Sequence, residues 1–414
     1  MKRHRFAWLL LACAGAAGAA GDFLPPAPVA LDAIDALPAV RAAKLRAQEA
    51  GARGEALAKG PYGVELSVLP MVRHEDRGTA YGEWEAQVLR RFRLPRKAAL
   101  DRRIGEIGRE AATLGVADAR HAGARRLLEL WFEWLRSAGA AAIAAQQLEV
   151  ARAEDAAVAK RVAAGDLALL DAERSRAALA QAEGALARAQ AQGERARVAL
   201  ETQFPSLILP AALPEVPEPA AAGDCAEDEI VEAILRESHE VGIAESMARR
   251  QGLAAERAEA DRHPDPGVGL RVLDEGRGSE QAVGLVLNIP FAGAGARPAA
   301  RAERDLAAAL AADAAGVRDA VRSEARQLAA GIARLLSAWQ AAQRARLAGE
   351  AALARTERAW TLGEAGYADV ALARRTTQDA RAQEWQARLD VHAARLQVEV
   401  DSHRLWARHD DHPH

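Results

Sequence analysis

The sequence is poor in aromatic residues, in cysteine and in long apolar segments. Aromatic residues make up 4% of the 414 positions, although hydrophobic residues make up 50% and alanine is abundant. Small helix-forming side chains favour close contact between helices over a thick globular core. The two cysteines, Cys13 and Cys225, predict no structural disulfide, because Cys13 lies in an N-terminal segment that resembles a cleaved signal. Beyond that segment no apolar run approaches the roughly 20 residues of a membrane-spanning helix.

The charge and the motifs exclude several classes of function. The formal net charge is -3, so neither sign dominates and no nucleic-acid partner is expected. No nucleophile–base pair, phosphate loop or metal-ligand cluster stands out, so we predict neither enzymatic activity nor a cofactor or bound metal. Gly293 and Gly295 resemble the start of a dinucleotide fingerprint, but Pro298 occupies the third glycine position and no βαβ pattern surrounds it. The His- and Asp-rich residues 410–414 are expected to form a polar tail.

Residues 1–20 have the pattern of a secretory signal peptide. Lys2, Arg3 and Arg5 precede the apolar segment 6–20, which becomes rich in small residues. The stretch Leu10-Leu11-Ala12-Cys13 also resembles a lipobox, in which case Cys13 would carry a lipid.

Two segments in each half of the chain change from helical periodicity to alternation. In 63–69, Val64, Leu66 and Val68 fall on one face, whereas Glu65 and Ser67 fall on the other. The same alternation predicts strands at about 62–70, 84–94, 267–273 and 282–290. Strands of this length, with one apolar and one polar face, are typical of hairpins in membrane β-barrels.

The remainder of the chain is predominantly helical in pattern. We predict helices over 31–59 and 228–262, and two long helical hairpins over 96–204 and 297–407. An unbroken helix of about 65 residues would be roughly 100 Å long, which exceeds the dimensions of a globular domain. Trp131 and Trp134 have helical spacing and are expected to pack in the interior.

The pattern occurs twice, which indicates an internal duplication of about 200 residues. Gly165 precedes Asp171 by the same interval at which Gly363 precedes Asp369, and the two glycines are 198 residues apart. We therefore predict a first repeat at 21–214 with a hairpin tip near 165, and a second at 215–409 with a tip near 363–369. A proline-rich segment, 205–219, separates them.

Four strands per chain cannot close a membrane barrel, because the smallest barrels have about eight. Open edges would leave backbone groups without hydrogen bonds in lipid. A homotrimer would supply twelve strands, with the long helices continuing from the barrel as a cylinder. The fold class predicted is therefore mainly α with a β-barrel portion, and the assembly would be a conduit.

The ordered set of motifs resembles the TolC-like outer-membrane efflux proteins over essentially the whole mature chain. The resemblance depends on the strand pairs that end at Leu94-Pro95 and Ile289-Pro290, and on the two Gly-x5-Asp tips. It implies a homotrimer in the bacterial outer membrane, surrounded by lipid, with a twelve-stranded barrel and a periplasmic α-helical tunnel. It also implies a periplasmic adaptor and an inner-membrane pump of the resistance-nodulation-division type as partners.

The resemblance further implies roles for individual tip residues. Gly165, Asp171, Gly363 and Val370 would contact the adaptor, and Asp369 would form an acidic ring at the periplasmic aperture. Two positions depart from the family pattern: Leu372 stands where a second acid would follow Asp369, and Ala172 follows Asp171. The glycines and aspartates would also serve simply to end and cap helices.

The cargo and the lipid contacts stay open. The compact length and the stretch L-N-I-P-F-A-G-A-G-A-R (287–297) resemble the branch that exports heavy-metal cations, whereas multidrug efflux and type I secretion use the same fold. A periplasmic coiled-coil adaptor or scaffold is the alternative of a different class. One basic cluster suits either lipid phosphates or a solvated, lumenal face: Arg90, Arg91, Arg93, Arg96 and Lys97.

Overall fold

The computed structural model describes residues 23–74, 78, 80–221 and 226–408, and it is mostly helical with one antiparallel sheet. The predicted signal peptide, Cys13 and the tail 410–414 lie outside these residues. The helices are α1 (Ala27–Asp35), α2 (Pro38–Lys59), α3 (Pro95–Ala163), α4 (Leu169–Gln203), α5 (Glu227–Glu237), α6 (His239–Ala260), α7 (Ala296–Thr361) and α8 (Tyr367–Asp401). The strands are β1 (Val64–Arg73), β2 (Tyr81–Arg91), β3 (Gly267–Glu275) and β4 (Glu280–Asn288). No helix among the described residues is both long enough and apolar enough to cross a lipid bilayer.

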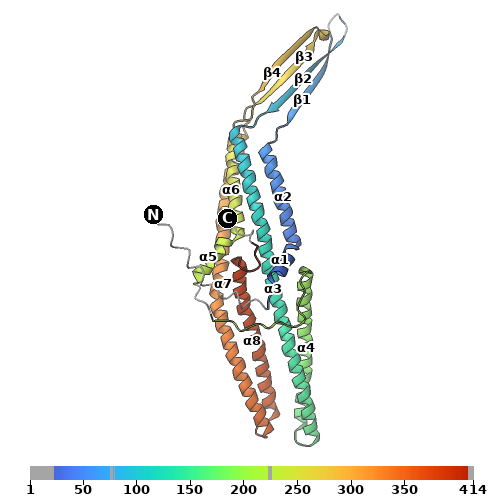
Figure 1. The fold of residues 1–414 in the computed structure, drawn as a ribbon, viewed down its shortest axis with the longest axis vertical. Helices are drawn as coiled ribbons and strands as arrows, with labels where there is room; N and C mark the ends of the chain where they lie inside the picture. The colour runs from blue at the N-terminus through green and yellow to red at the C-terminus, as the bar shows by residue number, and fades with distance from the viewer. Residues whose placement is uncertain (1–22, 75–77, 79, 222–225, 409–414) are drawn as a thin grey trace, which may run out of the picture. The chain divides into compact units, whose positions relative to one another are not determined.

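The two halves of the chain contain the same elements in the same order (Figure 1). Two short helices precede two strands, a very long helix follows, and a shorter helix returns. The long helices α3 and α7 have 69 and 66 residues, and the return helices α4 and α8 have 35 residues each. This order confirms the predicted fold class of duplicated helical hairpins and β-hairpins.

The first helix of each half is broken where one continuous helix was predicted. In the first half the break lies at Ala36 and Leu37, because Pro38 has no N–H to donate and suits the first position of a new helix. In the second half Ser238 has an extended backbone (φ -67°, ψ 111°), and α6 starts directly after it. The helix predicted over 31–59 is also longer at its start, because α1 begins at Ala27.

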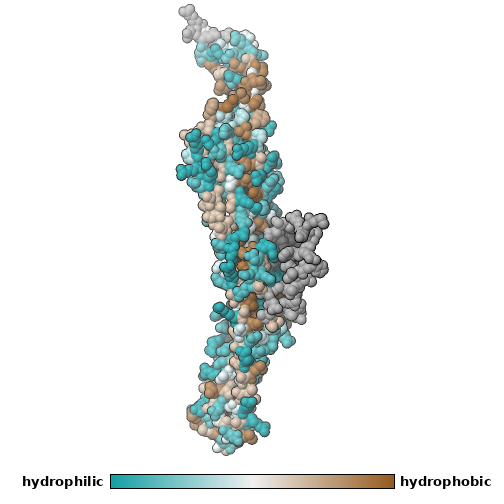
Figure 2. Space-filling model, turned by 90° about the vertical axis from the view of Figure 1, so that its left-hand side faces the viewer, coloured by the Kyte–Doolittle hydropathy of each residue, from teal (hydrophilic) through white to brown (hydrophobic). Residues whose placement is uncertain are grey.

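The four strands form a single sheet in the order β1-β2-β3-β4, with every pair antiparallel (Figure 1). The register aligns Leu66, Val88, Leu270 and Leu285 across the sheet, so apolar side chains of all four strands share one face. That face is exposed in the single chain: Leu66 retains 67% of its surface and Leu285 retains 85%. Figure 2 shows hydrophobic side chains gathered over the strands.

Strand bounds differ from the predicted ones by a few residues. The largest shift is in β2, predicted at 84–94 and observed at Tyr81–Arg91. Its start extends because Tyr81 and Gly82 pair with Arg73 and Val72 of β1. It ends early because Arg93 leaves the sheet and donates hydrogen bonds to backbone carbonyl oxygens at the end of α2.

Contacts divide the chain into two compact units, and neither coincides with a predicted repeat. The first unit comprises 1–41, 118–238 and 321–414, and the second comprises 42–117 and 239–320. Each unit combines residues of both halves, as the pairing of β2 with β3 illustrates. Each compact unit thus includes parts of both predicted repeats, 21–214 and 215–409.

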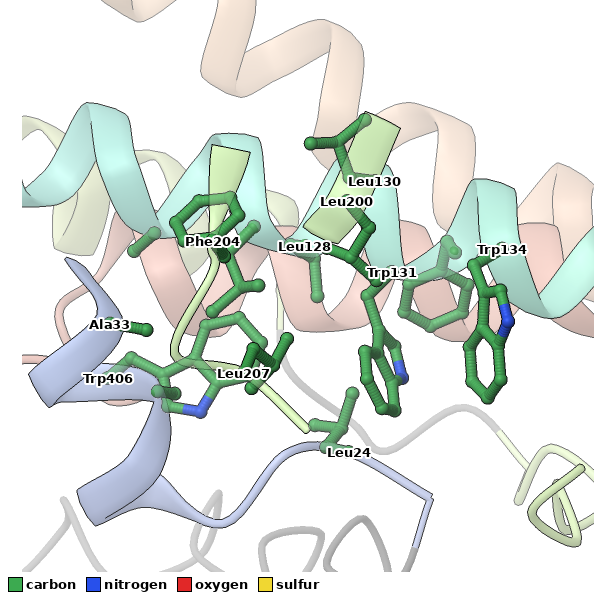
Figure 3. Close-up of a cluster of buried hydrophobic side chains, with 14 of the residues drawn as sticks. Leu24, Ala33, Leu128, Leu130, Trp131, Trp134, Leu200, Phe204, Leu207 and Trp406 are labelled. Carbon is green, nitrogen blue, oxygen red and sulfur yellow. The ribbon is translucent and has the colours of Figure 1, made fainter. Parts of the chain in front are cut away.

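The first unit contains the main hydrophobic core (Figure 3). Residues from α3, α4 and α8 surround the N-terminal segment, with Phe132, Leu200 and Phe204 almost wholly buried. Trp131 is 3% exposed, and its indole N–H donates a 2.9 Å hydrogen bond to the carbonyl oxygen of Phe23. Trp131 and Trp134 are packing residues, as the sequence predicted, because both are buried with ring centroids 4.9 Å apart.

In the second unit, a buried ionic network joins the strands to the helices. The side chain of Lys97 is 2% exposed and lies 3.2 Å from the carboxylate of Asp265, which is equally buried. Asp265 also accepts hydrogen bonds from the Leu94 backbone N–H and the Tyr62 hydroxyl, each at 2.9 Å. Buried charges are tolerated only where partners of this kind replace water. The network therefore sets how the chain passes from strand to helix.

Candidate functional site

Each helical hairpin turns through the same backbone motif, with glycine at the position that requires it. Gly165 has φ +81° and Gly363 has φ +78°, and an added Cβ would meet no atom within 4 Å at either one. Glycine is therefore required by the backbone conformation and not by lack of space. In the first tip the N–H groups of Gly165 and Asp166 donate to the carbonyl oxygens of Val162 and Arg161 at 3.0 and 2.9 Å.

The second tip repeats these hydrogen bonds. The N–H groups of Gly363 and Glu364 donate to the carbonyl oxygens of Trp360 and Ala359 at 3.1 and 2.9 Å. This pair of bonds is the Schellman motif, which satisfies carbonyl groups that would otherwise end the helix without partners. The predicted tips near 165 and 363–369 thus correspond to five-residue turns, 164–168 and 362–366.

The two aspartates of the Gly-x5-Asp pattern lie in the first turn of the return helices, not in the turns themselves. Asp369 is exposed, and its carboxylate accepts a 3.0 Å hydrogen bond from the backbone N–H of Gly366. Asp171 is half-buried, and its carboxylate lies 3.4 Å from Arg174. An acidic group in the first turn also interacts favourably with the helix dipole. Asp369 is therefore both a capping residue and an exposed charge.

Val370 differs from the other predicted tip residues because its side chain is fully buried. Ala172, its counterpart in the first repeat, is 3% exposed. A partner protein that meets the tip surface would therefore not meet the Val370 side chain in this conformation. Successive residues of a helix point in different directions, so neighbours in sequence lie on different faces. Val370 therefore faces the interior, whereas Asp369 faces outward.

An apolar cluster in the first unit joins the two hairpins close to their tips. Tyr367, the first residue of α8, is 2% exposed and packs with Val158 of α3 and Ala172 of α4. Burial raises the pKa of Tyr367 to about 12, and the nearby carboxylate of Glu154 acts in the same direction. The phenol is therefore neutral at physiological pH and contributes mainly by packing.

Arg374 links three helices beside this cluster. Its guanidinium forms an ion pair with Glu154 of α3 and lies 2.7 Å from a carboxylate oxygen of Glu357 on α7. The side chain of Glu154 is only 10% exposed. Burial raises the pKa of Glu154, although the charge of Arg374 acts against that shift. Removal of Arg374 would leave Glu154 as a half-buried carboxylate with no nearby cation in this group.

An aromatic–cation contact completes the link between the hairpins. The guanidinium carbon of Arg161 lies 5.0 Å from the ring centroid of Trp360, a geometry that favours a cation–π interaction. Trp360 in turn lies 6.5 Å from the ring of Tyr367. No sequence motif marks Trp360 or Tyr367 as functional. Their one signal is rarity, because the chain has three tyrosines and eight tryptophans, and two of these aromatics flank a tip.

Leucine side chains are exposed at both tips. Leu169 and Leu170 start α4 and are 65% and 53% exposed, whereas Leu362 and Leu372 flank the second turn at 61% and 66%. Single exposed leucines are ordinary, but these four all lie within a few residues of the two turns. Exposed apolar side chains near the exposed Asp369 carboxylate suit contact with another protein.

Comparison with solved structures identifies the fold. The CusC transmembrane channel superposes with a TM-score of 0.73 at 16% identity, over 91% of this chain and 91% of that one. The Campylobacter jejuni outer-membrane channel CmeC gives 0.73 at 13% identity, over 91% and 84%. The Neisseria gonorrhoeae outer-membrane channel MtrE, solved in its open state, gives 0.72 at 17% identity, over 94% and 90%.

Comparison of sequences alone does not identify a family. No protein-family model matches the chain. No curated protein matches it either. At identities of 13 to 17% the likeness is one of structure, and it extends over almost the whole length of each channel. The chain thus has the fold of TolC-like outer-membrane channels.

Proposed function

We propose that the chain is the outer-membrane channel of a tripartite efflux system. The observation that carries this proposal is the sheet in the second unit. Its apolar face is exposed in the single chain, and β1 and β4 have no further strand partner among the described residues. Backbone groups at such edges need partners in lipid. Three copies would supply 3 × 4 = 12 strands, enough to close the sheet upon itself.

This assembly would be a passive conduit without enzymatic activity. The apolar face would contact outer-membrane lipid, and the opposite face would line a wet lumen. On that opposite face Arg271 of β3 lies 2.6 Å from a carboxylate oxygen of Glu85 on β2. The helical hairpins would extend into the periplasm as a tunnel.

The assembly is tested by expression of the full-length chain in a Gram-negative host. We expect a trimer in the outer-membrane fraction that resists sodium dodecyl sulfate until heated, and that conducts ions in planar bilayers. A monomer in the soluble periplasmic fraction would refute the proposal. It would favour the alternative of a periplasmic coiled-coil adaptor or scaffold.

At the tips we propose contact with a periplasmic adaptor that connects to an inner-membrane pump of the resistance-nodulation-division type. Gly165 and Gly363 shape the turns that would meet the adaptor, Asp171 would meet it from the first turn of α4, and the exposed leucines would supply apolar contact area. Val370 would act only from the interior, by supporting the first turn of α8. Crosslinking from a photoreactive residue at Leu362, compared with one at an exposed position in the middle of α7 such as Arg326, tests this placement.

For Asp369 we propose a ring of three carboxylates around the threefold axis at the periplasmic aperture. Like charges brought close together attract cations and disfavour anions. Leu372, one turn later and 66% exposed, would add an apolar ring in place of a second acidic one. Asp369→Asn removes the charge but keeps an oxygen that can accept the Gly366 hydrogen bond. The variant therefore distinguishes a role of the charge at the aperture from a role of the side chain in capping α8.

Conductance in planar bilayers distinguishes these roles. Asp369→Asn should raise the current of the closed channel and reduce its cation selectivity, whereas Asp171→Asn, at the matching position of the first repeat, should change neither. Unchanged current and selectivity in Asp369→Asn would leave Asp369 with its capping role alone.

For the cargo we propose heavy-metal cations, on the resemblance of residues 287–297 to the metal-exporting branch. Multidrug efflux and type I secretion are the competing cargoes of the same fold. A deletion strain compared with its complemented parent should lose tolerance to metal salts and keep its tolerance to lipophilic drugs. The opposite pattern would assign the chain to drug efflux.

A further inference from the structure

A basic hollow lies at the foot of the second β-hairpin, within the second compact unit. Its volume is about 560 Å³. It is formed where α6 ends and α7 begins, and is lined by Glu259, Arg262, Arg297, Arg301, Arg304 and Asp305. Arg262 precedes the first residue of β3 by five positions, and Arg297 follows the last residue of β4 by nine. The hollow therefore lies just beyond the ends of these two strands.

The charges of the lining residues do not balance. Four arginines face two carboxylates, which leaves 4 - 2 = +2. Glu259 is shared between Arg262 and Arg304, and Arg301 lies 3.8 Å from Asp305. A guanidinium offers about five N–H donors, and these contacts use only one or two of them on each arginine. Arg297 forms no ion pair within the described part of the chain, so the hollow presents several free donors.

Donors of this kind suit a phosphate group. The planar fork of arginine binds phosphate oxygens in pairs, which a single lysine ammonium cannot do. The hydrogen bond from Arg262 lowers the pKa of Glu259, so this carboxylate stays ionised and the site keeps a net charge of +2 at neutral pH. A net +2 charge matches a phosphate ester or dianion better than it matches a zwitterion.

The chain beside the hollow is apolar. Ile289 and Phe291 lie between β4 and α7 and are 59% and 91% exposed. Leu285 and Leu287 continue this surface along β4 at 85% and 65%. In transmembrane β-barrels, girdles of aromatic residues mark the two interfaces between lipid tails and headgroups. The order along the chain is thus apolar strand, exposed aromatic, then arginine cluster.

Several cations at the foot of the first β-hairpin pair with other groups of the protein. Arg93 binds Asp101 at 2.7 Å and two backbone carbonyl groups. Lys97 is buried between Asp261 and Asp265. Arg91 lies 3.6 Å from Glu65. Arg93 and Lys97, two of the five cations considered for lipid contact from the sequence, are therefore held inside the protein, whereas each arginine of the hollow keeps N–H donors outside these contacts.

We propose that the hollow binds the phosphate of an anionic lipid headgroup, with an acyl chain lying against Ile289, Phe291 and the apolar face of β4. The inference that the hollow binds a phosphate group depends only on the arginines. The inference that this phosphate belongs to a membrane lipid rests on the proposed function. One such site per chain would anchor the channel at a defined depth in the membrane. It would involve the second repeat and not the first.

The test measures lipid binding to the delipidated full-length protein in detergent. Native mass spectrometry would compare phosphatidylglycerol with phosphatidylcholine and with inorganic phosphate. Arg297→Gln/Arg301→Gln removes two lining arginines. Arg102→Gln/Arg103→Gln is the matched control, because this pair is exposed near the start of α3, removes the same charge and does not line the hollow.

We expect phosphatidylglycerol to bind in preference to phosphatidylcholine. Each arginine near an anionic headgroup contributes about fivefold, so the first pair should weaken binding roughly 25-fold and the control pair should leave it unchanged. Equal losses from both pairs would overturn the site, since general surface charge would explain them. Inorganic phosphate that binds as tightly as the lipid would overturn the lipid as its source.

Trimer migration and bilayer conductance of the same preparations keep the two proposals separate. Lipid binding that depends on Arg297 and Arg301 in a protein that forms no channel would refute the proposed function and support the site. A conducting trimer whose lipid binding is the same with and without these substitutions would refute the site and support the proposed function.

Discussion

Replacement of Asp265 by asparagine should destabilise the second unit markedly, because Asp265 is the buried partner of a buried lysine. The side chains of Asp265 and Lys97 are each 2% exposed. Removal of one member of a buried ion pair costs about 3–5 kcal/mol. Lys97 keeps Asp261, which lies 3.0 Å away but is 53% exposed, so the lower value of about 3 kcal/mol is expected.

The corresponding change in melting temperature follows from the size of the unit. Residues 42–117 and 239–320 sum to 76 + 82 = 158. For a cooperative unit of this size 1 kcal/mol corresponds to roughly 2–4 °C, so Asp265→Asn should melt about 6–12 °C below the parent at pH 7. Circular dichroism at 222 nm, recorded during heating in detergent, measures this difference in melting temperature. Glu256→Gln, an exposed carboxylate on α6, is the matched control and should shift the midpoint by about 1 °C or less.

The pH dependence provides a second measurement on the same variants. Burial alone would raise the pKa of Asp265, but hydrogen bonds from Leu94, Tyr62 and Lys97 outweigh it and hold the pKa below its usual range. A carboxyl group with a lowered pKa in the folded state stabilises the protein above its unfolded pKa of about 4. That contribution is lost as the pH falls through the lowered folded value. The difference between parent and Asp265→Asn should therefore shrink below about pH 4.

The double variant Lys97→Met/Asp265→Asn decides whether the charge pair is the cause. Once both charges are absent no buried ion lacks a partner, so the double variant should melt above Asp265→Asn. The reasoning fails if Asp265→Asn melts within 2 °C of the parent, or if the two single losses simply add in the double variant.

Three further predictions use other parts of the chain. Gly363→Ala should lower the free energy of unfolding by about 1 kcal/mol, because φ at Gly363 is +78°. Gly331→Ala, in the interior of α7, should raise the free energy of unfolding by a similar amount. Thermal unfolding that shifts in the same direction in both variants would contradict the role of Gly363 in the turn. Phe132→Ala should cost about 3–5 kcal/mol because the ring is 1% exposed in the core, and a loss below about 1 kcal/mol in denaturant unfolding would show that it is not packed there. Ultraviolet titration should show one tyrosine ionising near pH 12, and that step should vanish in Tyr367→Phe; a native Tyr367 that ionises near pH 10 would contradict its burial.

The order of the elements could be predicted because it depends on local periodicity. Alternation in 63–69 and 267–273 and the helical pattern between strands and tips depend on residues close in sequence. The turn glycines were also predictable, since only a residue that tolerates positive φ closes a Schellman turn. The breaks at Leu37 and Ser238 were missed because one proline or one extended residue interrupts a pattern that continues on both sides.

The contacts between distant segments needed the tertiary structure. Tyr367 packs against Val158, and Arg374 pairs with Glu154, although each partner lies about 200 residues away in the sequence. No local sequence pattern predicts contacts over such a separation. The same holds for the basic clusters. Arg93 and the arginines of the hollow look alike in sequence, but one is bound to Asp101 and the others retain free donors.

The residues alone thus determined a duplicated chain with two β-hairpins, two long helical hairpins and glycine turns at their tips. Those features are set by side-chain period and by backbone conformation within a few residues. Tertiary structure decided that the compact units cross the repeats, that Val370 is buried while Asp369 is exposed, and which cations are free to bind a ligand. Burial and pairing depend on where distant segments meet, and residue order does not specify that meeting locally.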